Sequence, residues 1–386
     1  MQLTPGQKDV RALSVLFPVF ALTGVAHAIG GSLLPSLVSI FHLNDSQAGL
    51  LFFLYFAGTS FGAILCTSRF TQRMTLGFLF MAACCGAAAL SHWPLILFVF
   101  FPLGISVGVP MSAVSLYAGR NFPQRRAAIL SFLNFTWSVG AFAAPLLAGW
   151  ILLRHSFRDA YLILAGAAIV AFFACLLLPA DTPRPAISAS EIRARNLRPI
   201  LVFALAAFLQ VGAENTAAAW LSTYALRSAN TTIAIAAAEP SLYWAGFLAS
   251  RAVASFLLLR MRDLVVLRVA TALAFVASLL LILLPTVAAR SAAMLLLGIS
   301  LAPVYPLVVA GSFARVRDAA DSRWVLASAG MGGSFLPWLA GSISAQTGSL
   351  RTGILIMPAA LLGLMLLLPL FSGTRQSLPR PANHSA

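Results

Sequence analysis

The stretch Leu54–Gly58 reads Leu-Tyr-Phe-Ala-Gly, and it recurs 188 positions later as Leu-Tyr-Trp-Ala-Gly at Leu242–Gly246. Three further pairs of matching segments occur in the same order along the chain. They are Phe20–Leu22 with Phe203–Leu205, Leu103–Ser106 with Leu297–Ser300, and Gly140–Gly149 with Gly332–Gly341. Four ordered matches at offsets of 183 to 194 residues indicate that the second half of the chain repeats the first.

The composition of the chain predicts a membrane protein. Of its 386 residues, 60% are hydrophobic and 9% are charged, whereas about a quarter of the residues of a soluble domain are charged. So little charge could not cover a water-facing surface, and we therefore expect the lipid bilayer to surround the chain. A spanning helix needs about 20 apolar residues. The apolar runs separate into twelve such segments, at residues 13–41, 47–67, 74–91, 94–118, 127–153, 159–180, 199–226, 239–260, 264–285, 289–313, 324–346 and 352–372.

The basic residues are distributed unevenly between the connections of these segments. With the N-terminus placed in the cytoplasm, 18 of the 25 Lys and Arg residues fall in cytoplasmic loops and tails, 5 fall in outer loops, and Arg251 and Arg268 lie within segments. This bias follows the positive-inside rule and places both termini in the cytoplasm. The net charge of +15 is spread between apolar segments, so it does not form the clustered basic face that nucleic-acid binding requires.

One polar stretch divides the chain in two. Residues 181–198 contain two prolines and four arginines, and this stretch separates the sixth segment from the seventh. We therefore expect an N-terminal six-helix bundle at 1–180, a cytoplasmic linker at 181–198, and a C-terminal six-helix bundle with a short cytoplasmic tail at 199–386. The predicted fold class is an all-α membrane protein with twelve transmembrane helices in two pseudo-symmetric bundles.

A duplication of six segments around a basic linker resembles the major facilitator transporters, in which two parallel halves rock around a central site. The resemblance covers essentially the whole chain. It implies a secondary transporter that works by alternating access, as a monomer, in a membrane such as the bacterial inner membrane. The loop after the second segment, Ser68–Arg73, keeps the arginines of the superfamily's signature but lacks its Asp and its glycines.

A narrower resemblance lies in the seventh segment. Gly212–Asn215, followed by Trp220-Leu221 and Tyr224, is similar to a stretch of the fucose/galactose/glucose–proton symporter family. Asn134, a few residues after Arg125-Arg126, resembles the sugar-contacting Asn of that family's fifth span, and this resemblance implies that Asn134 contacts the substrate. That family carries acidic residues in its first and fourth spans, where this chain has Gly30-Gly31 and Pro110-Met111. Both carboxylates that the family ties to proton coupling are therefore missing.

Polar groups at membrane depth mark the candidate site, because burying them in a bilayer is costly. Glu214 is the one acidic residue deep in a segment, and Gln210 lies one turn before it on the same face. Arg251 lies about 13 Å from the end of its helix at 1.5 Å per residue, where it could pair with Glu214 or reach toward the cytoplasmic surface. The repeat places His27 opposite Gln210. The predicted substrate-binding residues are His27, Asn134, Trp137, Gln210, Glu214, Asn215, Arg251, Tyr305 and Trp338, and the possible proton sites are Glu214 and His27.

This set of residues favours a carrier for a neutral, hydroxyl-rich small molecule such as a sugar. An amide offers both a donor and an acceptor to a hydroxyl group, and an indole ring suits the apolar face of a sugar ring. The alternative is an efflux carrier for hydrophobic or cationic compounds, since one acid in an aromatic cavity could serve that role. We find no nucleophile–base pair, metal-ligand cluster or phosphate loop, so we expect no enzyme activity, no metal and no cofactor. With both family carboxylates absent, we expect proton coupling to be weak or absent.

Overall fold

The computed structural model describes residues 5–179, 197–229, 231–315 and 319–371, and these residues are helical with short connections. The first half contains α1 (Pro5–Phe41), α2 (Asp45–Leu65), α3 (Phe70–Leu90), α4 (Leu95–Asn121), η1 (Pro123–Arg125), α5 (Arg126–Leu152) and α6 (Phe157–Cys175). The second half contains α7 (Leu197–Ala229), α8 (Ile233–Ala238), α9 (Ser241–Arg260), α10 (Asp263–Leu283), α11 (Val287–Leu301), α12 (Val304–Arg315), α13 (Ala319–Thr347), α14 (Leu350–Gly353), α15 (Ile356–Leu367) and η2 (Leu368–Phe371).

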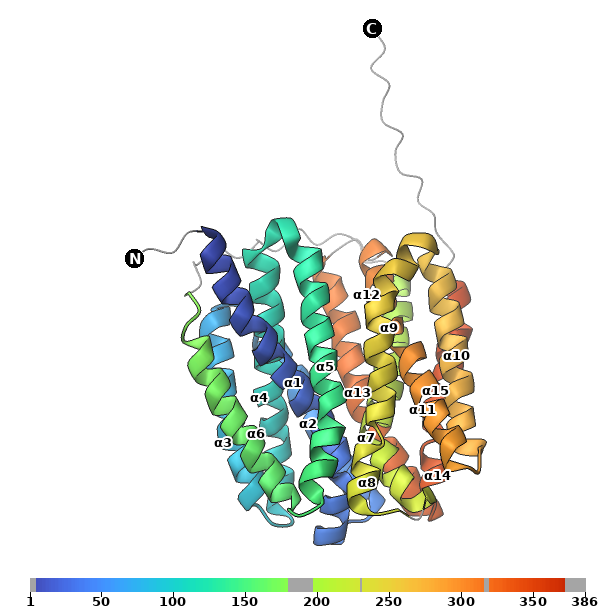
Figure 1. Ribbon diagram of the computed structural model, residues 1–386. Coiled ribbons are helices and arrows are strands. Elements are labelled where there is room, and N and C mark those ends of the chain that lie inside the picture. The colour runs from blue at the N-terminus through green and yellow to red at the C-terminus, as the bar shows by residue number, and fades with distance from the viewer. Residues whose placement is uncertain (1–4, 180–196, 230, 316–318, 372–386) are drawn as a thin grey trace.

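These helices run side by side along one common direction (Figure 1). Within the described residues, ten helical stretches are long and apolar enough to cross a membrane, and two of these stretches, Val287–Ser312 and Leu350–Phe371, each span a break between successive helices. The helices α9 and α13 stand at the positions of the predicted eighth and eleventh segments. The architecture is therefore consistent with the twelve predicted membrane passes.

Two helices begin earlier in the chain than the sequence predicts. Helix α1 begins at Pro5 rather than at residue 13, and α7 begins at Leu197, so the last two residues of the predicted linker are helical. A helix satisfies its own backbone hydrogen bonds, so it can continue past the apolar stretch that crosses the membrane. Residues 181–196 of the linker lie outside the described residues.

The repeated sequence segments contain points at which two helices cross closely. A side chain on Gly58 of α2 would overlap the carbonyl oxygen of Phe101, and one on Gly104 of α4 would overlap that of Tyr55. The second half makes the same crossing between α9 and α11, where Gly246 faces Leu295 and Gly298 faces Tyr243. Small residues let two helix backbones approach closely in a bilayer. The sequence repeat is thus a repeat of helix packing.

The two halves meet through a limited set of helices. Helices α1, α2 and α5 of the first half contact α7, α8, α9 and α13 of the second half.

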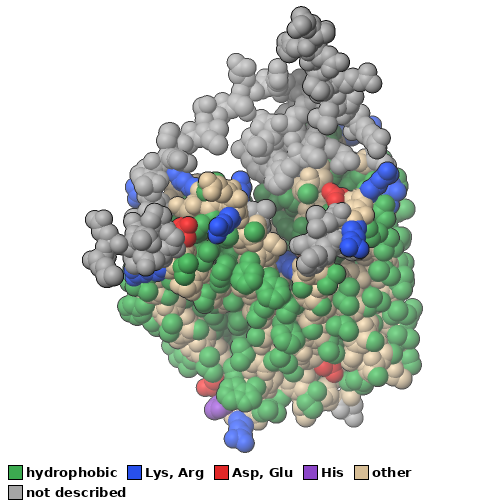
Figure 2. Space-filling view, turned by 45° about the horizontal axis from the view of Figure 1, so that its top comes forward, with side chains coloured by type: hydrophobic (Ala, Val, Ile, Leu, Met, Phe, Trp, Pro, Cys, Tyr) green, Lys and Arg blue, Asp and Glu red, His purple; other side chains and the backbone are tan. Residues whose placement is uncertain are grey.

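Hydrophobic side chains cover the sides of the molecule, and most of the visible Lys and Arg side chains gather toward one end (Figure 2). We call this end, where α1 and α7 begin, the basic end, and the other end, where α2 begins, the opposite end. Apolar sides between polar ends are what a bilayer requires.

Substitution of the crossing glycines should destabilise the protein. In Gly104→Ala or Gly298→Ala, the new methyl group would displace a neighbouring backbone, and such overpacking costs about 1–3 kcal/mol. Thermal unfolding of the purified protein in detergent should show a lower Tm for both variants. The control is Gly166→Ala, because a side chain there meets no atom within 4 Å. An unchanged Tm in both crossing variants would contradict this packing.

Candidate functional site

A group of polar and aromatic side chains lies where the two halves meet, and we call it the central cluster. Each residue comes from one of the helices that form the contact between the halves. The members are His27 of α1, Trp137 of α5, Gln210 and Glu214 of α7, and Trp244 and Arg251 of α9.

Arg251 links the second half to the first. Its Nη1 donates hydrogen bonds to the backbone oxygen of Asn134 at 3.1 Å and to Oγ of Ser138 at 2.9 Å, both on α5. Its guanidinium group also lies over the rings of Trp137, at 5.3 Å, and Phe247, at 4.6 Å. Cation–π contacts of this kind contribute more where water is excluded. The positive charge is therefore held by polar and aromatic groups inside the bundle.

Glu214 is held mainly by its own helix. Nε2 of Gln210 donates a hydrogen bond to Oε2 of Glu214 at 2.9 Å, across one helical turn. No hydrogen bond or ion pair joins the side chains of Glu214 and Arg251 in the described part of the chain. Arg251 therefore neither pairs directly with Glu214 nor extends to the basic end, which were the two arrangements expected from the sequence.

His27 sits among aromatic rings from both halves. Its ring centroid lies 5.4 Å from that of Phe56, 5.2 Å from that of Trp137 and 6.5 Å from that of Trp244. Phe56 and Trp244 occupy equivalent positions in the repeated Leu-Tyr-Phe-Ala-Gly and Leu-Tyr-Trp-Ala-Gly segments. Two residues at equivalent positions of the repeat, one from each half, therefore contact the imidazole ring of His27.

Four buried polar atoms in this region have no hydrogen-bond partner among the described residues. They are Nδ1 of His27, Nε1 of Trp137, Oε1 of Gln210 and the hydroxyl group of Tyr243. Tyr243 contacts Trp244, with ring centroids 4.9 Å apart, so it adjoins the central cluster. Buried polar groups in proteins are nearly always paired. These four atoms leave both donors and acceptors available to a small polar molecule.

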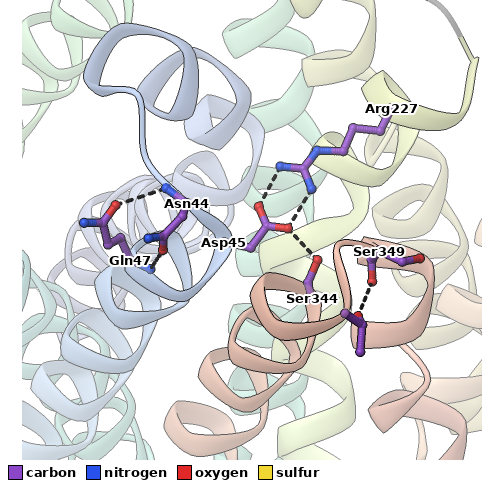
Figure 3. Close-up of polar contacts among 7 residues, drawn as sticks. Asn44, Asp45, Gln47, Arg227, Ser344 and Ser349 are labelled. Carbon is purple, nitrogen blue, oxygen red and sulfur yellow. Dashed lines mark hydrogen bonds and ion pairs between the residues drawn. The ribbon is translucent and has the colours of Figure 1, made fainter.

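A second polar group joins the halves at the opposite end, and we call it the clamp. The carboxylate of Asp45, at the start of α2, accepts hydrogen bonds from Nη1 and Nη2 of Arg227 at 2.7 and 2.6 Å (Figure 3). It also accepts one from the hydroxyl group of Ser344 on α13. Asn44 and Gln47 cap the start of α2 and fix the position of Asp45. A bidentate arginine–carboxylate pair is a directional contact, so the clamp links the two halves at the opposite end.

The sequence matches the model of the Major Facilitator Superfamily over residues 16–322. The chain is a member of this superfamily. The family and the fold are those of a membrane transporter rather than of an enzyme. No curated protein matches the sequence.

Solved structures of other superfamily members share this fold. One is FucP, the E. coli fucose:proton symporter, whose structure is in the outward conformation. It superposes on this chain with a TM-score of 0.63 and shares 20% sequence identity, over 94% of this chain and 99% of that chain. A D-xylose-proton symporter superposes with a TM-score of 0.76 and shares 13% sequence identity, over 93% of this chain and 97% of that chain. The nucleoside transporter NupG superposes with a TM-score of 0.71 and shares 12% sequence identity, over 94% of this chain and 100% of that chain.

The transporter structure separates the predicted site residues into two groups. Tyr305 of α12 lies near enough to Glu214 to interact with it electrostatically, and so joins the central cluster. Asn134 borders it through its backbone contact with Arg251, while its side-chain amide donates to the backbone oxygen of Leu130 at 2.9 Å.

Asn215 and Trp338 lie elsewhere. The amide of Asn215 donates to the backbone oxygen of Gly333 at 3.2 Å, which ties α7 to α13 within the second half. Trp338 packs against Phe53 and Phe335 where α13 meets α2. Both side chains are therefore engaged in helix packing here.

The glycine at one missing family carboxylate has a visible role. A side chain on Gly31 of α1 would overlap the carbonyl oxygen of Ala218 on α7, so a carboxylate would not fit there in this conformation. In the fourth pass, Pro110 packs against Gly77 of α3, away from the contact between the halves. Neither position contributes to the central cluster.

Sequence reasoning missed Trp244, Phe56, Ser138 and the clamp. The repeat was a signal for Phe56 and Trp244, because it places them at equivalent positions. Asp45 was assigned to the loop before the second segment and Arg227 to an outer loop, so nothing in the local pattern paired two residues 182 positions apart.

Breaking the clamp should open the opposite end. Asp45→Ala removes the carboxylate of the clamp. Because Arg227 is 39% exposed, solvent screens this ion pair, and the pair together with the Ser344 hydrogen bond contributes on the order of 1–1.5 kcal/mol. The hydroxyl oxygen of Ser342 lies 3.5 Å from that of Ser46 in the other half. A cysteine introduced in place of Ser342 should therefore react with a maleimide roughly tenfold faster in Asp45→Ala than in the parent.

The matched control for this labelling experiment is Asp159→Ala. Asp159 lies at the same end, but it accepts its hydrogen bonds from Ser156 of its own half. The four native cysteines are buried, which limits background labelling. Equal labelling rates in Asp45→Ala and the parent would show that the clamp does not hold this end closed.

Proposed function

We propose that this transporter carries a small, neutral, hydroxyl-rich solute, such as a sugar, across the membrane by alternating access. The observation that carries this proposal is the set of unpartnered polar atoms at the central cluster. Two of them, on Trp137 and Tyr243, can donate a hydrogen bond, and Oε1 of Gln210 accepts one. A hydroxyl group both donates and accepts, so several hydroxyl groups on one ring would match this mixture.

The aromatic rings support the same class of solute. Indole rings of Trp137 and Trp244 lie 5.7 Å apart between the halves and offer apolar faces beside the polar atoms. FucP and the D-xylose-proton symporter have the same fold, and their names state that they transport sugars. The fold can therefore accommodate such a substrate. We include His27, Trp137, Gln210, Glu214, Arg251 and Tyr305 in the proposed site, with Asn134 at its border.

The alternative, efflux of hydrophobic cations, fits the cluster less well. A cationic substrate would use the aromatic faces for cation–π contacts. Arg251 already occupies the faces of Trp137 and Phe247. A second cation beside this guanidinium group would meet like-charge repulsion. A neutral solute meets no such opposition.

Alternating access requires that the contacts between the halves exchange. In our proposal, residues 1–180 and 199–386 move as two bundles joined by a linker at 181–198. The clamp closes the opposite end in the present conformation, and it must break when that end opens. Arg251 crosses from α9 to α5 at the central cluster, so its contacts would change in the same movement.

We further propose that the basic end faces the cytoplasm, in keeping with the positive-inside rule. The chain then lies in a membrane such as the bacterial inner membrane with both termini inside, and it works as a monomer. A reporter fused after Ala386 should be active only on the cytoplasmic side, and activity on the outer side would contradict this orientation.

Loss of the amide at the cluster should weaken solute binding. In a thermal-shift panel of neutral sugars, polyols and cationic dyes, we expect a sugar or polyol to raise the Tm by mass action. Gln210→Ala should weaken the binding of that solute about tenfold to a hundredfold, since a hydrogen bond lost from a buried polar group costs about 1–3 kcal/mol.

The control variant for binding is Gln346→Ala, which removes an exposed amide at the opposite end, away from the cluster. Stabilisation by cationic dyes alone would favour the efflux function. Parent-like binding in Gln210→Ala would move the site away from the central cluster.

Transport should not accumulate solute at the expense of a proton gradient. The family's two coupling carboxylates are replaced by Gly30-Gly31 and Pro110-Met111. Only Glu214, and less plausibly His27, is then left at membrane depth to exchange a proton. In proteoliposomes with an imposed pH gradient and no solute gradient, we expect equilibration only. Accumulation that Glu214→Gln abolishes would contradict this expectation and assign the coupled proton to Glu214.

A further inference from the structure

A cavity of about 390 Å³ lies at the opposite end of the second half. Its walls come from the end of α7, the connection between α10 and α11 together with the first turn of α11, and the start of α14. Three arginine side chains line it, namely Arg227, Arg290 and Arg351. Each comes from a different one of these walls, so the cavity brings together charges that are far apart in sequence.

This concentration of positive charge needs a physical reason. Only five of the 25 basic residues belong to the outer loops predicted from the sequence, and three of those five line this one cavity. Like charges around a common space repel one another unless an opposite charge lies between them. The planar guanidinium group matches the geometry of phosphate oxygens and forms paired hydrogen bonds with them. The lining therefore suits an anion that carries several oxygen atoms.

The three arginines are held in different ways. Arg290 is only 9% exposed, and its Nη2 donates a hydrogen bond to the backbone oxygen of Ser228 at 2.9 Å. Glu239 interacts with Arg290 electrostatically but does not line the cavity. Arg351 is exposed at the start of α14. Arg290 is thus a fixed charge in the wall, and Arg351 is a charge at the mouth.

Arg227 belongs both to this cavity and to the clamp. It lines the cavity and also binds the carboxylate of Asp45 in the other half. In the alternating access proposed above, Asp45 would move away with α2 when the opposite end opens, and Arg227 would lose its carboxylate. An anion in the cavity could then replace the carboxylate as the partner of Arg227.

We propose that this cavity is a binding site for a phosphate-like anionic group, and that the group competes with Asp45 for Arg227. Occupancy of the cavity then favours the conformation in which the opposite end is open. The inference rests on the alternating access proposed above, but it does not depend on which solute the central cluster binds. The phosphate group comes either from inorganic phosphate in solution or from the headgroup of an anionic lipid, since lipid phosphates lie at the same depth as helix ends.

The test measures binding and not transport. The Tm of the purified protein in detergent is followed against inorganic phosphate, with sodium chloride at matched ionic strength as the reference. In parallel, the Tm is compared between nanodiscs of phosphatidylcholine and nanodiscs containing phosphatidylglycerol. A saturable rise with phosphate identifies the free anion, and a rise confined to phosphatidylglycerol identifies the lipid headgroup. The absence of both rises overturns the proposal.

Substitutions assign the effect to the cavity. Arg351→Gln should weaken binding of the effective probe at least tenfold, because it removes a charged hydrogen-bond donor. The matched control is Arg154→Gln, which removes an exposed arginine at the same end of the first half, and it should bind like the parent. Equal weakening in both variants would mean a response to net charge alone, and it would overturn the site.

Asp45→Asn separates competition from simple structural support. This variant frees Arg227 from its carboxylate, so it should bind the probe several-fold more tightly than the parent. A purely structural role for Asp45 would instead lower the Tm without strengthening the binding of the probe. Unchanged or weaker binding in Asp45→Asn would overturn the proposed competition.

Discussion

A guanidinium group inside a hydrocarbon layer must be solvated by the protein itself, and the middle of this transporter is arranged around that requirement. Arg251 obtains two hydrogen bonds from α5 and two aromatic faces, one from each half. Trp137, placed against Arg251, also contacts His27 and Trp244. Meeting the needs of one charge therefore draws α1, α5 and α9 together and creates the aromatic and polar surroundings that we assign to the solute.

The contacts between the halves are of two kinds, and they lie at different depths. At the central cluster, charge is shared among hydrogen bonds and ring faces, and several polar atoms have no protein partner. At the opposite end, the carboxylate of Asp45 is fully engaged by Arg227 and Ser344. The incomplete set of contacts suits a place where a ligand binds and leaves, whereas the complete set suits a place that holds one conformation.

Sequence reasoning predicted the parts of this arrangement that depend on one helix or on the repeat. Gln210 and Glu214 are bonded because they are one turn apart, and the matching glycine segments are crossing points because both halves use the same packing. Asn215, one residue after Glu214, points to α13 because successive helix residues differ by about 100° around the axis. The partners of Arg251 and Asp45 were not predictable in this way. They depend on how separate helices lie side by side, which no local spacing encodes.

The contact surface between α1 and α7 has a mechanical consequence. Gly31 lies against the backbone of Ala218, and Gly49 of α2 lies against the backbone of Trp338. Glycine presents no side chain that could interlock with its neighbour, so these parts of the interface are smooth. Two smooth surfaces can separate and meet again without any rotamer having to change. The stronger resistance to opening then comes from the side-chain contacts elsewhere between the halves, such as Asp45 with Arg227 and Trp338 with Phe53.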